Sequence, residues 1–127
     1  NGLDALELAQ NNYFDIILCS EMLEHVPDTQ IVLKEFNRIL SKTGLLIVSI
    51  PNEKQVQKLL DLSRKFKFSR LIEGVSTSEN DQNEWHLQDA SVEWLKEKSL
   101  NLFSIEKLIN YPKIFNLRII ATLKKLE

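Results

Sequence analysis

Two short apolar runs limit what this chain can fold into more than any other feature of its sequence. Phe14–Cys19 reads Phe-Asp-Ile-Ile-Leu-Cys, and Leu45–Ile50 reads Leu-Leu-Ile-Val-Ser-Ile. Nearly continuous apolar runs of this length are typical of strands buried on both faces, as in a parallel sheet covered by helices. The sequence therefore predicts two neighbouring parallel strands.

The segment between the two runs has the pattern of an amphipathic helix. Its apolar residues recur at intervals of three and four, at Val32, Phe36, Ile39 and Leu40. Asp28 or Thr29 is expected to cap the start of this helix. The turn Ser41–Gly44 is expected to end it, with Gly44 in the left-handed conformation that is common just past a helix. Strand, helix and strand together predict a βαβ unit.

The remaining segments predict further helices and a closing hairpin. Glu53–Phe68 and Ser91–Lys98 have helical patterns, and the polar stretch Gly74–Asn83 is expected to be a loop. Phe103–Ile109 and Leu117–Leu123 are expected to be antiparallel strands, because the connection between them is short. The predicted fold class is α/β with an antiparallel C-terminal hairpin.

Composition excludes several classes of protein. The 127 residues suit one domain, and 16 basic against 18 acidic side chains give a net charge of −2. That balance argues against a surface built to bind nucleic-acid phosphates. No apolar run approaches the roughly 18–20 residues that cross a bilayer, so neither a nucleic-acid nor a membrane partner is expected. A single cysteine excludes an internal disulfide and fits a reducing, cytoplasmic compartment.

The stretch from Phe14 to Asp28, with Leu40–Gly44 and Ile50–Asn52, resembles the class I S-adenosylmethionine-dependent methyltransferases, in their small-molecule type 11 and type 12-like group. In that family the fourth strand begins with Phe-Asp and its loop ends in Leu-Glu-His-Val. A helix and a Leu-Lys-Pro-Gly-Gly-like turn lead to the fifth strand. The resemblance implies a partial Rossmann-like fold, with a mostly parallel sheet, an antiparallel C-terminal hairpin and helices on both faces.

The chain departs from the family pattern mainly in its glycines. It has three, Gly2, Gly44 and Gly74, and no two are close enough to form the family's glycine-rich cofactor loop. The acidic ribose-binding residue has no counterpart either, and the Ser41–Gly44 turn lacks the proline and first glycine. Residues 1–127 are therefore expected to be the C-terminal part of a single methyltransferase domain without its first strands. The isolated chain is expected to be inactive.

The resemblance implies a cofactor site for S-adenosylmethionine at five residues: Asp4, Ala5, Cys19, Ser20 and Glu21. Gly2-Leu3-Asp4-Ala5 is similar to the turn whose acid accepts a hydrogen bond from the adenine amino group, although Asp4 also fits an ordinary turn. Cys19 and Ser20 match positions that contact the cofactor through the backbone. Cys19 also fits a small buried hydrophobe, and both readings can hold together.

Glu21, Glu24 and His25 form the main alternative site. If Ser20–His25 is helical, all three side chains share one face, and two carboxylates with an imidazole suit a divalent cation. Ubiquinone-pathway O-methyltransferases and small-RNA 2′-O-methyltransferases are similar in this Glu-x-x-Glu-His pattern and use it for metal. The alternative is that Leu-Glu-His-Val occurs in metal-free methyltransferases, where the histidine lines the active site or fixes the loop. The prediction is no metal, with these three residues as candidates.

Two histidines are the catalytic candidates. His25 lies in the motif, and His86 lies in a stretch expected to be a polar loop, where an imidazole would suit a general base near neutral pH. His86 also fits a merely exposed residue, and Glu84-Trp85-His86 is an alternative source of a fourth metal ligand.

The resemblance implies S-adenosylmethionine-dependent methyl transfer to a small-molecule acceptor, as part of a longer chain. Whether oxygen, nitrogen or carbon is methylated stays open. One alternative is a non-catalytic methyltransferase-like partner, which forms a homodimer or another complex through an exposed sheet edge. Another is a divalent-metal-dependent enzyme that uses Glu21, Glu24 and His25.

Overall fold

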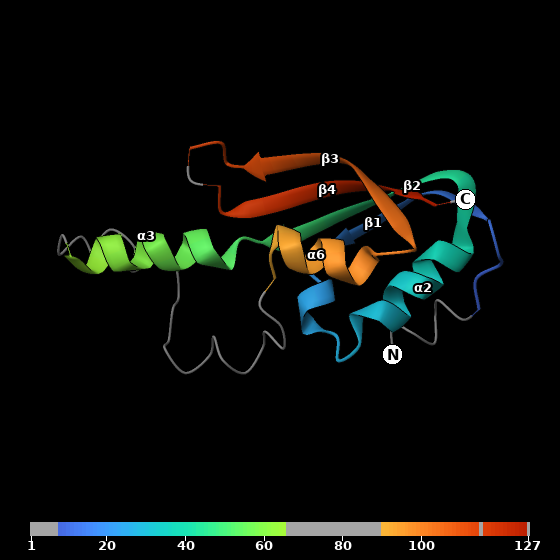
Figure 1. Cartoon of the computed structure of the whole chain (residues 1–127), viewed down its shortest axis with the longest axis horizontal. Coiled ribbons are helices and arrows are strands. Elements are labelled where there is room, and N and C mark those ends of the chain that lie inside the picture. Colours follow the sequence, from blue (N-terminus) through green and yellow to red (C-terminus); the bar gives the residue numbers. More distant parts are fainter. Residues whose placement is uncertain (1–7, 66–89, 115, 127) are drawn as a thin grey trace.

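The computed structural model describes residues 8–65, 90–114 and 116–126. In chain order the elements are β1 (Phe14–Ser20), the 3-10 helix η1 (Leu23–His25), α2 (Thr29–Ile39), β2 (Leu40–Pro51), α3 (Glu53–Lys65), α6 (Val92–Ser99), β3 (Phe103–Tyr111) and β4 (Arg118–Lys125) (Figure 1). The predicted order of strands and helices is confirmed over these residues. The expected loop Gly74–Asn83 and the end of the helix expected to reach Phe68 lie outside the described residues.

The four strands form one sheet in the order β1-β2-β4-β3. β1 and β2 are parallel, with Cys19 opposite Val48, so the predicted βαβ unit is confirmed. β4 is antiparallel to both β2 and β3, which confirms the predicted C-terminal hairpin. Three of the four strands therefore run in one direction and β4 alone runs in the other. This is the mixed α/β sheet that the methyltransferase resemblance implied.

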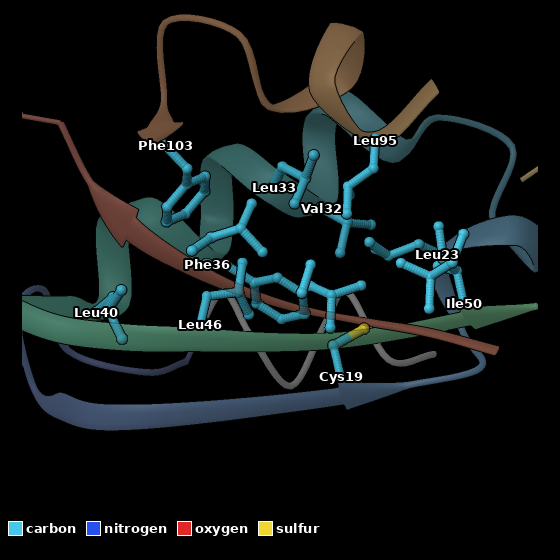
Figure 2. Packing of buried hydrophobic residues seen from close by; sticks show 14 of the residues in the cluster. Cys19, Leu23, Val32, Leu33, Phe36, Leu40, Leu46, Ile50, Leu95 and Phe103 are labelled. Carbon is cyan, nitrogen blue, oxygen red and sulfur yellow. The ribbon is translucent and has the colours of Figure 1, made fainter. Parts of the chain in front are cut away.

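The hydrophobic core lies between one face of the sheet and the helices α2, α6 and η1 (Figure 1). Figure 2 shows side chains of α2 and α6 meeting side chains of the strands in this layer. The fully buried residues include Leu46, Val48 and Ile50 of β2 and Ala121 and Leu123 of β4. Each buried leucine or isoleucine contributes roughly 1.5–3 kcal/mol relative to an exposed one, so this layer provides most of the driving force for folding.

The opposite face of the sheet is open over β1 in the described structure. Ile16 is 62% exposed and Leu18 is 71% exposed, although both are as apolar as their buried neighbours. They pair with Leu45 and Ile47 of β2, which are themselves only partly buried. The expected helices are therefore present on one face, and no described helix covers β1 on the other. Figure 1 shows α3 leaving the end of β2 and running away from the sheet.

The start of α2 confirms one of the two predicted caps. The Asp28 carboxylate accepts hydrogen bonds from the backbone N–H groups of Gln30 (2.9 Å) and Ile31 (3.3 Å). These groups have no partner within the first turn of a helix, so the side chain satisfies them.

No described helix is long and apolar enough to cross a membrane.

The predicted end of this helix at Gly44 is wrong. α2 ends at Ile39, and β2 begins at Leu40, whose backbone is already extended. Gly44 lies inside β2 and has no positive φ. The glycine is required by space instead, because a Cβ atom there would lie 2.8 Å from the Leu40 side chain and 3.0 Å from the Asp15 carbonyl oxygen.

Gly44→Ala is therefore expected to destabilise the fold by about 1–3 kcal/mol, the usual cost of overpacking a close contact. The Asp15 oxygen belongs to the backbone of the paired strand and cannot move aside without disturbing the β1–β2 ladder. Urea unfolding monitored by circular dichroism would measure the change. Thr43→Ala, at the exposed neighbouring position, is the matched control, and an equal effect in both variants would contradict this reading.

Candidate functional site

The candidate site lies where β1 and β2 end. Because these strands are parallel, their carboxyl ends meet at one edge of the sheet, which is where open α/β sheets bind ligands. Ser20 is the last residue of β1, is exposed and lies opposite Ser49 of β2. Glu21 follows with φ +48°, in the left-handed region that residues with a side chain seldom adopt. This residue turns the chain out of the sheet.

Glu21 contacts two residues that the sequence analysis did not single out. Its backbone N–H donates to the Ser49 carbonyl oxygen (2.9 Å), and the Ser49 hydroxyl donates to Glu21 Oε1. Arg118 Nε, at the start of β4, lies 4.0 Å from Glu21 Oε2. Ser49 and Arg118 come from different strands far along the chain, so no local motif could have identified them. We call Glu21, Ser49 and Arg118 the Glu21 cluster.

The predicted shared face of Glu21, Glu24 and His25 is wrong. Ser20–His25 is not one helix, because Glu21 is left-handed and η1 spans only Leu23–His25. The Glu21 carboxylate contacts Ser49, whereas Glu24 is fully buried. Within the described residues, no group of three or more histidine, cysteine, aspartate or glutamate side chains is placed to hold a metal ion.

His25 lies beside a buried carboxylate. Its Nε2 is 3.9 Å from Glu24 Oε1, and about a third of its side chain is exposed. The preceding Leu23 is fully buried, and its carbonyl oxygen accepts a hydrogen bond from the Thr29 hydroxyl (3.2 Å). The core thus holds the segment that presents His25 near the sheet edge. The catalytic role of His25 stays a prediction.

Cys19 is a buried thiol that points into the core cluster (Figure 2). Burial, and secondarily the negative charge of Glu24, raise its pKa to about 12. A thiol with this pKa is neutral at physiological pH, so Cys19 is neither a nucleophile nor a ready metal ligand. The reading of Cys19 as a small buried hydrophobe is confirmed, and its backbone contact with a cofactor stays a prediction.

Asp4, Ala5, Glu84 and His86 lie outside the described residues.

The Cys19 thiol is expected to resist modification by a disulfide reagent at pH 8 in the folded chain and to react promptly in guanidinium chloride. In the folded chain the pKa of the thiol is raised above its ordinary value of 9.0. Stability from the neutral thiol is therefore present below pH 9 and is lost as the pH rises from 9 towards 12. Cys19→Ala is the matched control for the pH dependence. Stoichiometric labelling of the native chain at pH 8 would contradict the buried position.

Comparison with known proteins identifies the family. A family model described as a methyltransferase domain matches residues 3–122. A ubiquinone biosynthesis O-methyltransferase of Nitrosomonas europaea is 36% identical over 50 residues, which cover 39% of this chain and 21% of that protein.

Two solved structures share the fold at low sequence identity. A protein from Sulfolobus solfataricus assigned to the type 11 methyltransferases matches with a TM-score of 0.62 and 17% identity, over 96% of this chain and 56% of its own. The N-methyltransferase NodS from Bradyrhizobium japonicum, in complex with S-adenosylhomocysteine, matches with a TM-score of 0.56 and 12% identity, over 96% of this chain and 51% of its own.

The chain thus spans little more than half the length of these solved relatives. The family model nevertheless covers nearly all of its residues, and the solved structures share its fold at TM-scores of 0.62 and 0.56. The chain therefore belongs to the methyltransferase domain family and has the class I S-adenosylmethionine-dependent methyltransferase fold.

Proposed function

We propose that this chain serves S-adenosylmethionine-dependent methyl transfer to a small-molecule acceptor, as the C-terminal part of a larger catalytic domain. The observation that carries the proposal is the family match over residues 3–122, together with the polar residues at the carboxyl edge of β1 and β2. The relation to a ubiquinone biosynthesis O-methyltransferase and to an N-methyltransferase supports a small acceptor and leaves the acceptor atom open.

The polar groups at the carboxyl edge of β1 and β2 are chemically suited to bind the cofactor. When bound, S-adenosylmethionine supplies an electrophilic methyl group on a sulfonium. Adenosine presents hydroxyl and amino donors, and the exposed end of β1 offers the hydroxyl of Ser20 and backbone groups from Cys19 to Glu21. Asp4 and Ala5 complete the proposed cofactor site. The protein contributes mainly by positioning the two reactants, which supplies much of the rate in such transfers.

We propose that His25 is the base that takes a proton from the molecule being methylated. An imidazole has an ordinary pKa near neutral pH and accepts a proton from a hydroxyl or amine as that group attacks the methyl. Its Nε2 lies 3.9 Å from Glu24 Oε1, at the end of η1 that follows the carboxyl edge of β1. His86 is the second proposed catalytic histidine.

The open sheet face supports the proposal that residues 1–127 are one part of a domain. The continuous apolar sequence of β1 is typical of a strand that is covered on both faces, yet the side chains of Ile16 and Leu18 are mostly exposed. In a larger domain, further strands would pair at the edge of β1 that no described strand occupies. The buried cysteine and the modest net charge support a cytoplasmic protein without nucleic-acid or membrane partners.

The same open face favours a second candidate, a non-catalytic methyltransferase-like partner. An uncovered strand edge with exposed apolar side chains can pair with another copy of the chain. In that case Ile16 and Leu18 would be dimer contacts.

Calorimetry with S-adenosylmethionine tests these proposals on the chain and on the full-length product of its gene, which we call the extended version. We expect binding by the extended version only. Leu18→Lys should lower the stability of the extended version by more than about 2 kcal/mol, because an apolar contact is lost and a charge buried. It should leave the chain alone nearly unchanged, because Leu18 is already exposed there.

Ile31→Lys, at a half-exposed position of α2, is the matched control and should be tolerated in both versions. Absence of binding by both versions would contradict the enzymatic proposal. If the chain alone also proved dimeric by light scattering, and Leu18→Lys dissociated the dimer, the second candidate would be favoured.

A further inference from the structure

We infer that Ser49 and Arg118 are positioning residues for the methyl-transfer site. They hold Glu21, and through it the segment Glu21–His25, at the carboxyl edge of the sheet. The inference rests on the proposed function, because this segment carries His25. It adds two residues that lie outside the Phe14–Asp28 motif and come from β2 and β4.

Of the two residues, Ser49 makes the stronger contacts with Glu21. Its carbonyl oxygen accepts the Glu21 backbone N–H (2.9 Å), and its hydroxyl donates to the Glu21 carboxylate. A hydrogen bond to a charged group is stronger than one between neutral groups. Ser49 itself is fixed, because β2 pairs with β1 on one side and with β4 on the other. One residue of a central strand thus sets both the backbone and the side chain of Glu21.

Arg118 makes a weaker contact that orients the Glu21 carboxylate. Its Nε lies 4.0 Å from Glu21 Oε2, and the arginine side chain is 60% exposed, so solvent screens the pair. Its backbone is nevertheless fixed opposite Pro51 by the β2–β4 ladder. The guanidinium and the Ser49 hydroxyl engage the two carboxylate oxygens of Glu21 separately, and this directs the carboxylate towards the sheet.

These contacts explain how Glu21 keeps an unfavourable backbone conformation. A left-handed φ in a residue with a side chain persists only where surrounding contacts enforce it, and such residues often occur at functional sites. Here it turns the chain from β1 into η1, where Leu23 is fully buried. The Glu21 cluster fixes one side of this turn and the core fixes the other. His25, at the end of η1, therefore receives a defined position.

The role of Glu21 follows from the direction of its side chain. Because its backbone N–H and its carboxylate both contact Ser49, and its carboxylate lies near Arg118, Glu21 acts by holding the loop. Removal of Ser49 or Arg118 should therefore loosen the loop and weaken ligand binding while leaving the core intact.

Hydrogen exchange on the chain tests the structural half of the inference. We expect exchange in the peptide covering residues 20–27 to rise about tenfold in Ser49→Ala and about threefold in Arg118→Ala, in line with a hydrogen bond to a charge and an exposed ion pair. Ser49→Thr and Arg118→Lys keep the hydroxyl and the charge and should restore most of the protection. Ser41→Ala on β2 and Lys124→Ala on β4 are matched controls on the same two strands.

Calorimetry with S-adenosylhomocysteine on the extended version tests the functional half. Ser49→Ala should weaken binding about tenfold, with a melting temperature within the range of the control variants, and Ser49→Thr should restore the affinity. Unchanged exchange in Ser49→Ala and Arg118→Ala, or faster exchange with unchanged affinity, would overturn the inference. Failure of the unaltered extended version to bind would instead contradict the proposed function, and the exchange result would still decide whether the cluster holds the loop.

Discussion

The parallel pairing of β1 with β2 is the constraint on which the rest of the structure depends. Two parallel strands need a crossover, and α2 supplies it while covering the face that carries Leu46, Val48 and Ile50. The same pairing brings both carboxyl ends to one edge, so Ser20 lies opposite Ser49. If the strands ran antiparallel, the end of β1 would lie beside the start of β2, and the Glu21 cluster could not form.

β4 also shapes the site, because it is antiparallel to both of its neighbours, β2 and β3. Its first residue, Arg118, lies opposite Pro51, the last residue of β2. An antiparallel partner thus brings the start of a C-terminal strand to the edge where the other strands end. This is why a guanidinium from β4 approaches the carboxylate that follows β1. The site is assembled from three strands although the recognisable motif lies in one loop.

Much of the fold could be predicted from local pattern. The apolar runs and the 3.6-residue period identified β1, α2 and β2, and the capping role of Asp28 follows from the preference of short polar side chains for the first turn of a helix. Gly44 was misread because a glycine just past a helix usually ends it. The actual reason, the closeness of the Leu40 side chain and the Asp15 carbonyl, depends on contacts that become visible only once the strands are paired.

By itself, the sequence determined the βαβ unit, the hairpin and the position of the Leu-Glu-His-Val loop, because periodicity and short motifs are properties of neighbouring residues. The tertiary structure decided which side chains of the loop meet. It buried Glu24, turned its segment away from the Glu21 side chain through the left-handed backbone of Glu21 itself, and joined Glu21 to Ser49 and Arg118. The physical reason is that hydrogen bonds and ion pairs between strands depend on register, and register is set by packing over the whole sheet.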